Sequence, residues 1–249
     1  MSDRRSYDDP CGVARALDVV GERWALLVVR ELLLGPKRYT DLARGLPGSS
    51  PTVLSQRLRD LEAAGIVERS VAGPPVGGRV YALTPHGREL EDVLVALGRW
   101  GSRTVQTAAG ELTPDAFVLA LRTVADPARL AGWSARVELG IEDPGAPDRV
   151  TLTVAGGRLS AIRGAADRPD AVLSGRSSAL RPVAFGRRSL DDALTAGDLR
   201  VDGDAAVVRR LLGALVPPVP ARARARTQDG PPATAGGPSW ERVSSPAPA

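Results

Sequence analysis

Polar side chains recur at helical spacing in residues 51–64, and their types suit hydrogen bonding to a ligand rather than catalysis. Apolar residues mark one face of the expected helix, namely Leu54, Leu58 and Leu61. At about 100° per residue, Thr52, Gln56 and Arg59 lie nearly opposite them and point outward. In the DNA major groove a glutamine amide pairs with adenine and an arginine guanidinium with guanine, and each such pair gives about 1–3 kcal/mol of discrimination. For an isolated helix, this pattern favours a plain solvated face. Within a helix–turn–helix frame it favours a surface that reads base edges.

Further candidate contacts flank this face. Ser55 lies beside it, whereas Arg57 lies nearer the apolar edge, where it either reaches a phosphate or only extends along the protein surface. Ser49 and Ser50 precede the helix, whose free N–H groups are expected to hold a phosphate. Arg79 follows a glycine-rich loop and is the contact expected from that loop.

Catalytic and metal-binding groups are scarce in this chain. One cysteine, Cys11, and one histidine, His86, supply neither a zinc site nor a disulfide within the chain, and a catalytic triad would have to use His86. We expect His86 on the surface instead. Gly77-Gly78 and Gly156-Gly157 are expected turns that lack the spacing of a dinucleotide-binding loop. We therefore expect no catalytic residue, no metal, no cofactor and no enzyme activity.

The charge is basic but evenly spread. The formal net charge is +4, and every basic residue except Lys37 is an arginine. The surplus falls in residues 1–110 and 217–249, so nucleic-acid binding would depend on local placement. Lys37 and Arg38 either touch the DNA backbone or stay solvated at a helix end. The longest apolar runs, such as residues 25–29, are far too short for a membrane span, and a single cysteine suits a reducing compartment, so we expect no membrane and a cytoplasmic location.

Apolar periodicity indicates the elements that position these residues. The expected helices cover residues 13–20, 22–34, 41–46, 51–64 and about 86–104, and the expected strands cover 66–71 and 79–83. The second helix is expected at the centre of the core through Trp24, Leu27, Val28 and Leu32. Helix caps are expected at Thr40, Ser50 and Thr84, the last two followed by proline. This order is that of a winged helix–turn–helix domain, in which a short helix braces one that enters the major groove.

The last of these helices carries an apolar stripe at three- and four-residue spacing, formed by Leu90, Val93, Leu94, Leu97 and Trp100. Such a stripe belongs either to a core or to a dimer contact. We expect a dimer contact, because a small winged domain leaves this long helix unsupported. A homodimer on double-stranded DNA would read half-sites about 34–36 Å apart, or a multiple of that distance.

The expected fold class is α+β: a winged helix–turn–helix domain, a small α+β domain and a disordered tail. The expected boundaries are a flexible N-terminus at 1–10, the winged domain at 11–105, a linker at 106–116, the second domain at 117–216 and the tail at 217–249. One face of the second domain's sheet is expected to carry Val150, Leu152, Val154, Leu159, Ile162, Val172 and Leu173.

Four segments of the first region resemble HxlR-type transcriptional regulators. They are residues 11–24 (CGVARALDVVGERW), 30–39 (RELLLGPKRY), 54–67 (LSQRLRDLEAAGIV) and 80–87 (VYALTPHG). The resemblance covers residues 11–105 and implies a dimeric bacterial winged-helix protein that binds DNA. It also implies that Cys11 acts as a thiol sensor, with a helix N-terminus and nearby Arg15 lowering its pKa. The alternative is an inert cysteine, and without a second cysteine only an intersubunit or mixed disulfide remains.

Part of the second region resembles sterol-carrier-protein-2-like domains. The residues that carry this resemblance are 171–175, a helix from near Ser177, 189–194 and 196–204. It implies a sheet covered by helices, often with an apolar tunnel. A pocket would make the domain a sensor of an apolar small-molecule effector, whereas a closed core would make it a spacer or a dimer platform.

Together these features predict a sequence-specific transcriptional regulator that acts as a dimer, with repression the commoner outcome for such proteins. Two alternatives remain open. One is a thiol-responsive regulator switched through Cys11, with a passive second domain. The other is a carrier of lipid-like ligands, or an enzyme, whose winged helix mediates protein contacts.

Overall fold

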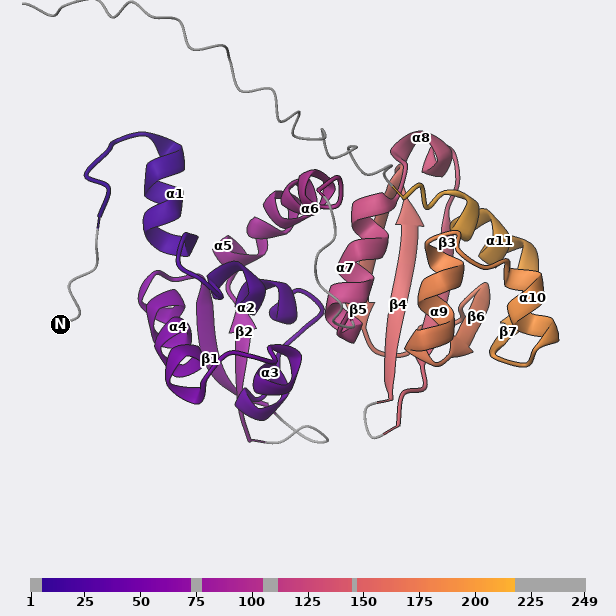
Figure 1. Ribbon diagram of the computed structural model, residues 1–249, viewed down its shortest axis with the longest axis horizontal. Helices are drawn as coiled ribbons and strands as arrows, with labels where there is room; N and C mark the ends of the chain where they lie inside the picture. Colours follow the sequence, from indigo (N-terminus) through magenta and orange to yellow (C-terminus); the bar gives the residue numbers. More distant parts are fainter. Residues whose placement is uncertain (1–5, 73–77, 105–111, 145–146, 218–249) are drawn as a thin grey trace, which may run out of the picture.

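The computed structural model describes residues 6–72, 78–104, 112–144 and 147–217, and these form two units that lie side by side (Figure 1). The first unit contains α1 (Gly12–Val20), α2 (Ala25–Leu32), α3 (Tyr39–Gly45), α4 (Pro51–Ala63), β1 (Val67–Ala72), β2 (Gly78–Leu83), α5 (Pro85–Arg88) and α6 (Leu90–Gly101). The second contains α7 (Pro114–Val124), α8 (Pro127–Leu130), β3 (Ala135–Ile141), β4 (Asp148–Ala155), β5 (Arg158–Arg163), β6 (Ala171–Gly175), α9 (Ser177–Ala184), α10 (Leu190–Thr195), β7 (Leu199–Gly203) and α11 (Ala205–Gly213).

The α+β class and the winged helix–turn–helix order of the first unit are confirmed. Ser50 caps α4 by accepting a hydrogen bond from the Val53 N–H, and Thr84 caps α5 by accepting one from the Gly87 N–H. Proline follows both caps, as the sequence indicates. The expected cap at Thr40 is wrong, because α3 begins at Tyr39. The long helix expected at 86–104 is divided into α5 and α6.

The core of the first unit forms where α2 and α4 meet. The predicted apolar face of α4 is buried in full, and α2 contributes Val28, Val29 and Leu32 to the same core. Leu27 differs from the prediction, because it lies on the opposite side of α2 and is exposed. Trp24 precedes α2 in a left-handed conformation (φ +78°) and is only half-buried, packing against the edge of the core.

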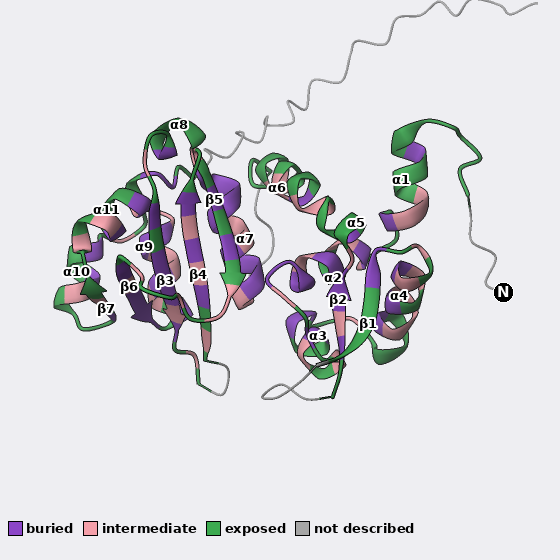
Figure 2. Ribbon diagram, turned by 180° about the vertical axis from the view of Figure 1, so that it is seen from behind, coloured by how far each residue is buried: buried purple, intermediate pink, exposed green. Residues whose placement is uncertain are grey.

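The second unit is a five-stranded sheet with helices packed on its inner face. The strand order is β5-β4-β3-β6-β7, and every neighbouring pair is antiparallel except β3 with β6. Figure 2, seen from behind, shows β3, β4 and β5 in front of the helices, with exposed residues alternating with buried ones. On α7, Phe117 meets Phe185 edge-to-face, with 6.0 Å between the ring centres. This contact ties α7 to the end of α9.

Two expectations about the second unit are corrected. Ile162 is 69% exposed, because strand alternation turns Leu159 and Ala161 inward and leaves Ile162 on the outer face. The expected linker 106–116 is too long, because α7 begins at Pro114, with Thr113 as its cap. Residues 105–111, and residues 218–249 of the tail expected at 217–249, lie outside the described residues.

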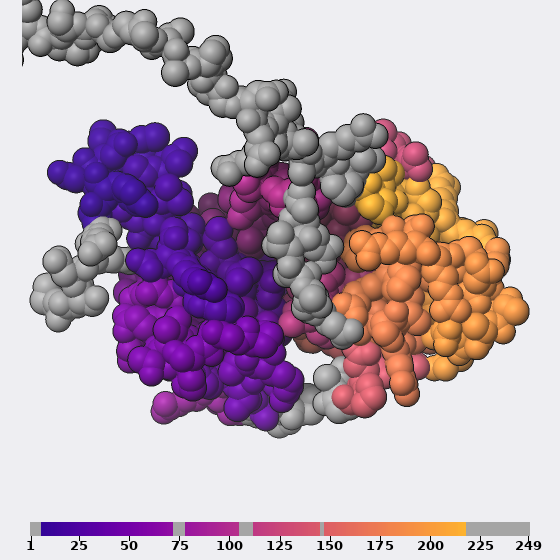
Figure 3. Space-filling view, viewed as in Figure 1, coloured from indigo at the N-terminus to yellow at the C-terminus, as the bar shows by residue number. Residues whose placement is uncertain are grey.

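The two units share one packed interface, with α6 and α7 between the rest of the first unit and the sheet (Figures 1 and 3). Leu34 of the first unit belongs to the core of the second, and Leu119 of α7 packs against the core of the first. The Arg163 N–H donates a hydrogen bond to the Leu34 carbonyl at 3.0 Å. Gly98 lets α6 approach α7, because an added Cβ would stand 2.8 Å from the Thr123 hydroxyl. The expected lack of support for the last helix of the winged domain is therefore wrong.

A buried ion network crosses this interface. Lys37 lies between Glu31 and Asp115, with its Nζ 2.7 Å from Glu31 Oε2 and 2.6 Å from Asp115 Oδ2, and all three side chains are buried. Arg163 donates two hydrogen bonds to Asp115, at 2.8 and 2.9 Å, and pairs with Asp148. Both expectations for Lys37, DNA contact and a solvated helix end, are wrong, because the second unit covers this residue.

We expect Lys37→Met to destabilise the protein by about 3 kcal/mol, because it leaves two buried carboxylates short of their shared cation. The free energy of unfolding from urea titration measures this loss. The control is Arg209→Met, which removes only an exposed ion pair with Asp191 and should cost about 1 kcal/mol or less. Equal, small losses in both variants would contradict a structural role for the network.

Candidate nucleic-acid interface

The turn between α3 and α4 is held by side-chain hydrogen bonds. The Tyr39 hydroxyl donates to the Pro51 carbonyl at 3.1 Å and accepts from the Ser55 hydroxyl at 3.4 Å. Ser49 donates to the Leu46 carbonyl at 2.9 Å, while Ser50 caps α4. Sequence reasoning did not single out Tyr39, although an aromatic residue with a polar tip at a helix start is a usable signal. These bonds fix the angle at which α4 is presented.

The outward face of α4 carries the predicted polar residues. Thr52 and Arg59 are exposed and Gln56 is half-buried. The helix α4 that carries them lies on the side of the first unit away from the second unit (Figures 1 and 2). A terminal nitrogen of Arg59 donates to Gln56 Oε1 at 2.6 Å, and Gln56 Nε2 donates to Asp60 Oδ1 at 2.8 Å. The structure thus brings Gln56 and Arg59 together in a hydrogen-bonded row. A base edge in contact with this face would replace the hydrogen bonds that Arg59 and Gln56 make within the row with hydrogen bonds to the base. Asp60, which the sequence analysis did not consider, anchors the row.

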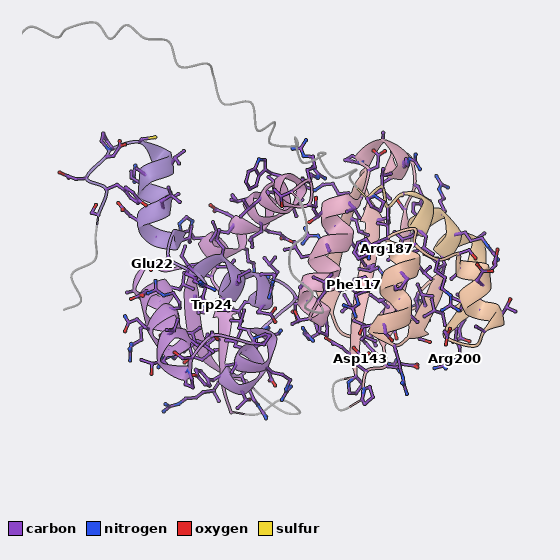
Figure 4. The ribbon with its side chains drawn as sticks, in the orientation of Figure 1. Glu22, Trp24, Phe117, Asp143, Arg187 and Arg200 are labelled. Atoms are coloured by element: carbon purple, nitrogen blue, oxygen red, sulfur yellow. The ribbon has the colours of Figure 1, made fainter. Side chains whose placement is uncertain are left out.

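Arg57 is placed differently from the other candidates. Its side chain is only 16% exposed and pairs with Asp60 at 3.3 Å and with Glu22 at 3.7 Å. Glu22 belongs to the segment between α1 and α2, where Figure 4 labels it near Trp24. Arg57 therefore braces α4 against this segment. Of the two roles weighed for it, extension along the protein surface is the one that this position supports.

The β1–β2 hairpin presents Arg79 near its tip. Arg79 is exposed and stands opposite Val71, next to residues 73–77, which lie outside the described residues. Farther back, the guanidinium of Arg69 lies 5.1 Å from the centre of the Tyr81 ring and its Nε lies 2.8 Å from Glu62 Oε1. The hairpin is thus tied to α4 through Glu62.

Cys11 is the exposed N-cap residue of α1. The nearby backbone N–H groups of Val13 and Ala14 hold the pKa of the Cys11 thiol below its ordinary value. The expected helix N-terminus is the cause, whereas Arg15 is not among the groups that lower this pKa. The Cys11 N–H donates a hydrogen bond to Asp9 Oδ1 at 2.8 Å.

The predicted apolar stripe on α6 divides into two sets. Leu94 is buried in the core of the first unit and Leu90 is half-buried against it, so the prediction of a dimer contact is wrong for Leu94. Val93, Leu97 and Trp100 are 51%, 45% and 63% exposed and follow one another at i, i+4 and i+7. They form an open apolar strip on the side of α6 away from the core at Leu94 and from α7 at Gly98.

Two further properties concern the described residues. They hold no cluster of three or more side chains that could ligate a metal ion. No helix among them is long and apolar enough to cross a membrane. His86 is exposed at the start of α5 beside Glu89, as expected for a surface residue.

Comparison with known proteins yields two family matches. Residues 19–109 match the HxlR-like helix-turn-helix family, and residues 118–216 match the SCP-2 sterol transfer family. An uncharacterized HTH-type transcriptional regulator of Synechocystis is 42% identical over 93 residues, which are 37% of this chain and 68% of that protein.

Two solved structures are similar to parts of the chain. One is a putative HTH-type transcriptional regulator, ytcD, at 35% identity, with a TM-score of 0.34 over 37% of this chain and 94% of that one. The other is an inverting sec-alkylsulfatase from Pseudomonas at 24% identity, with a TM-score of 0.40. It is matched over 42% of this chain, which spans only 16% of the sulfatase.

Proposed function

The chain belongs to the HxlR-like helix-turn-helix family, and on this premise we propose that it represses transcription as a cytoplasmic homodimer that reads a specific DNA operator. One observation carries this proposal. Thr52 and Arg59 on the polar face of α4 are exposed, Arg59, Gln56 and Asp60 form a hydrogen-bonded row, and α4 itself lies away from the second unit (Figure 1). A helix so placed fits the major groove, with its braced partner α3 behind it.

Within this proposal the residues divide by role. Arg59 and Gln56 read base edges, and Thr52 and Ser55 flank them. Ser49, Ser50 and the first N–H groups of α4 hold a phosphate and so set the register of α4 on the duplex. Arg79 contacts the backbone or the adjacent minor groove from the hairpin. Arg57 acts indirectly by holding α4 in place.

The dimer contact in this proposal is the open strip of Val93, Leu97 and Trp100. Exposed aromatic and branched side chains in one row on a helix favour burial against a matching helix. Self-association through α6 places two copies of α4 about a two-fold axis. The operator would then contain two related half-sites separated by about 34–36 Å or a multiple of it.

The second unit acts in this proposal as a sensor of a small molecule. Its sheet and helices enclose an apolar core that is closed around Phe117, so we do not place the effector there. The unit instead contacts α6, the helix that carries the strip, and a change at this contact would reach the dimer.

A thiol-responsive regulator is the second candidate, favoured by the exposed, pKa-lowered thiol of Cys11. A lowered pKa raises the thiolate fraction near neutral pH, and the thiolate is the reactive form. Because the chain has one cysteine, oxidation would link two subunits or add a small thiol.

The first prediction concerns DNA reading. In fluorescence anisotropy on the DNA upstream of its own gene, Arg59→Ala and Gln56→Ala should each weaken specific binding by about tenfold or more, since each removes one base contact. Log affinity should fall linearly with log salt concentration. Arg209→Ala, remote from α4, is the control. If neither α4 variant changes the preference for this DNA over scrambled DNA, α4 is not the reading element.

The second prediction concerns assembly. Leu97→Glu should convert the dimer into a monomer in sedimentation-equilibrium experiments, because it places a charge in the centre of the strip. Ile162→Glu, at an exposed apolar site on the sheet, should leave the dimer unchanged. A wild-type protein that is monomeric at tens of micromolar, or a dimeric Leu97→Glu variant, would refute the α6 dimer.

The third prediction concerns Cys11. The rate of its alkylation by iodoacetamide should rise with pH through a midpoint below that of free cysteine, and the midpoint should return to normal in urea. If the thiol-responsive candidate holds, diamide weakens DNA binding by the wild type and leaves Cys11→Ser unaffected. Equal responses of the two proteins would exclude it.

A further inference from the structure

A cleft of about 580 Å³ lies between the two units, apart from the DNA-facing surface. One wall is α6, through Val95, Ala96 and Arg99. The opposite walls come from the end of α7, from α8 and from the turn between β4 and β5. This volume lies within the range of sites that hold a small organic molecule, and such sites favour boundaries between domains.

Arg99 places a cationic guanidinium in this cleft and is held there by a hydrogen bond to the backbone. Its Nε donates to the Thr123 carbonyl at 3.2 Å, which fixes the stem against α7. Within the described part of the chain, its two terminal nitrogens have no hydrogen-bond or ion-pair partner. An anchored guanidinium with free terminal N–H groups matches the two oxygens of a carboxylate.

Arg158 offers a second cationic group from the β4–β5 turn. It pairs with Asp92 of α6 at 2.8 Å, and both side chains are more than 70% exposed. Such an exposed pair contributes little to stability. A ligand carboxylate can therefore replace Asp92 on Arg158 at small cost. Arg122 differs, because it is buried and committed to Glu91 and to the Leu159 carbonyl.

Apolar groups line the rest of the cleft. Val95, Ala96, Ala125, Leu130 and Leu159 surround the space beside the arginines. The lining as a whole therefore joins a positively charged edge to an apolar wall. A neutral sterol would offer no negatively charged partner to Arg99. A purely polar anion would leave the apolar wall exposed to water.

We propose that this interunit cleft binds a small amphipathic carboxylate, with its head on Arg99 and Arg158 and its apolar body against Leu130, Leu159 and Val95. The role of such a ligand as an effector rests on the proposed function, whereas its binding does not. Because α6 forms one wall, an occupant that displaces Asp92 loosens one of the ties between α6 and the second unit. The same helix carries the open strip of Val93, Leu97 and Trp100.

Isothermal titration calorimetry of the full chain with sodium octanoate tests the proposal. Octan-1-ol and octylammonium, which share the chain but lack the carboxylate, are the comparison ligands. Octanoate should bind at least about tenfold more tightly than either, because only its carboxylate can form charge-assisted hydrogen bonds with the guanidinium groups. Arg99→Gln should lower octanoate affinity by about tenfold, and Ala96→Trp should abolish binding by filling the cleft.

Arg168→Gln, at an arginine 93% exposed on the second unit, is the matched control and should bind octanoate like the wild type. The proposal is overturned if octan-1-ol binds as tightly as octanoate, or if Arg99→Gln behaves like Arg168→Gln. Octanoate binding that survives in Ala96→Trp would also overturn it. The titration contains no DNA, so its failure leaves the DNA-reading proposal intact, and failure of DNA reading leaves the site intact.

Discussion

A single buried cation determines how the two units are joined. Lys37 follows α2 in the winged domain, and its side chain lies between Glu31 of the same unit and Asp115 of the other. A buried ammonium between two carboxylates tolerates little displacement, because any gap leaves a charge without solvent or partner. The remaining contacts follow from this position: Arg163 closes on Asp115, the Leu34 carbonyl meets the Arg163 N–H, and Leu34 enters the second core.

The interface places α6 between the first core, α7 and the cleft. One side packs on the first core through Leu94, a second meets α7 at Gly98, and a third borders the cleft at Arg99. What remains open is the strip of Val93, Leu97 and Trp100. The helix is therefore the place where DNA reading, assembly and ligand binding would influence one another, while α4 stays on the far side with its hydrogen-bonded row intact.

Local pattern predicted much of this molecule. Repeats of apolar residues located α4 and its buried face, and Ser-Pro and Thr-Pro pairs located two helix starts. Strand alternation places Leu159 and Ala161 on one face of β5 and Ile162 on the other. The sequence therefore contained the signal that Ile162 points outward, and the error was to group Ile162 with Leu159. What failed was long-range: the burial of Lys37 depends on Asp115, 78 residues later. Likewise the partners of Arg57 and the cover over Leu94 come from elements that no nearby residue reveals.

The burial of Lys37 has a chemical consequence for the whole surface. Since no other lysine exists, every cationic side chain exposed to solvent, apart from a protonated His86, is a guanidinium, whose charge stays constant across the ordinary pH range. The ε-amine is the chain's one target for lysine-directed acylation or for a lysine-specific protease, and it lies inside the junction. Acylation or cleavage at Lys37 would therefore report when the two units separate.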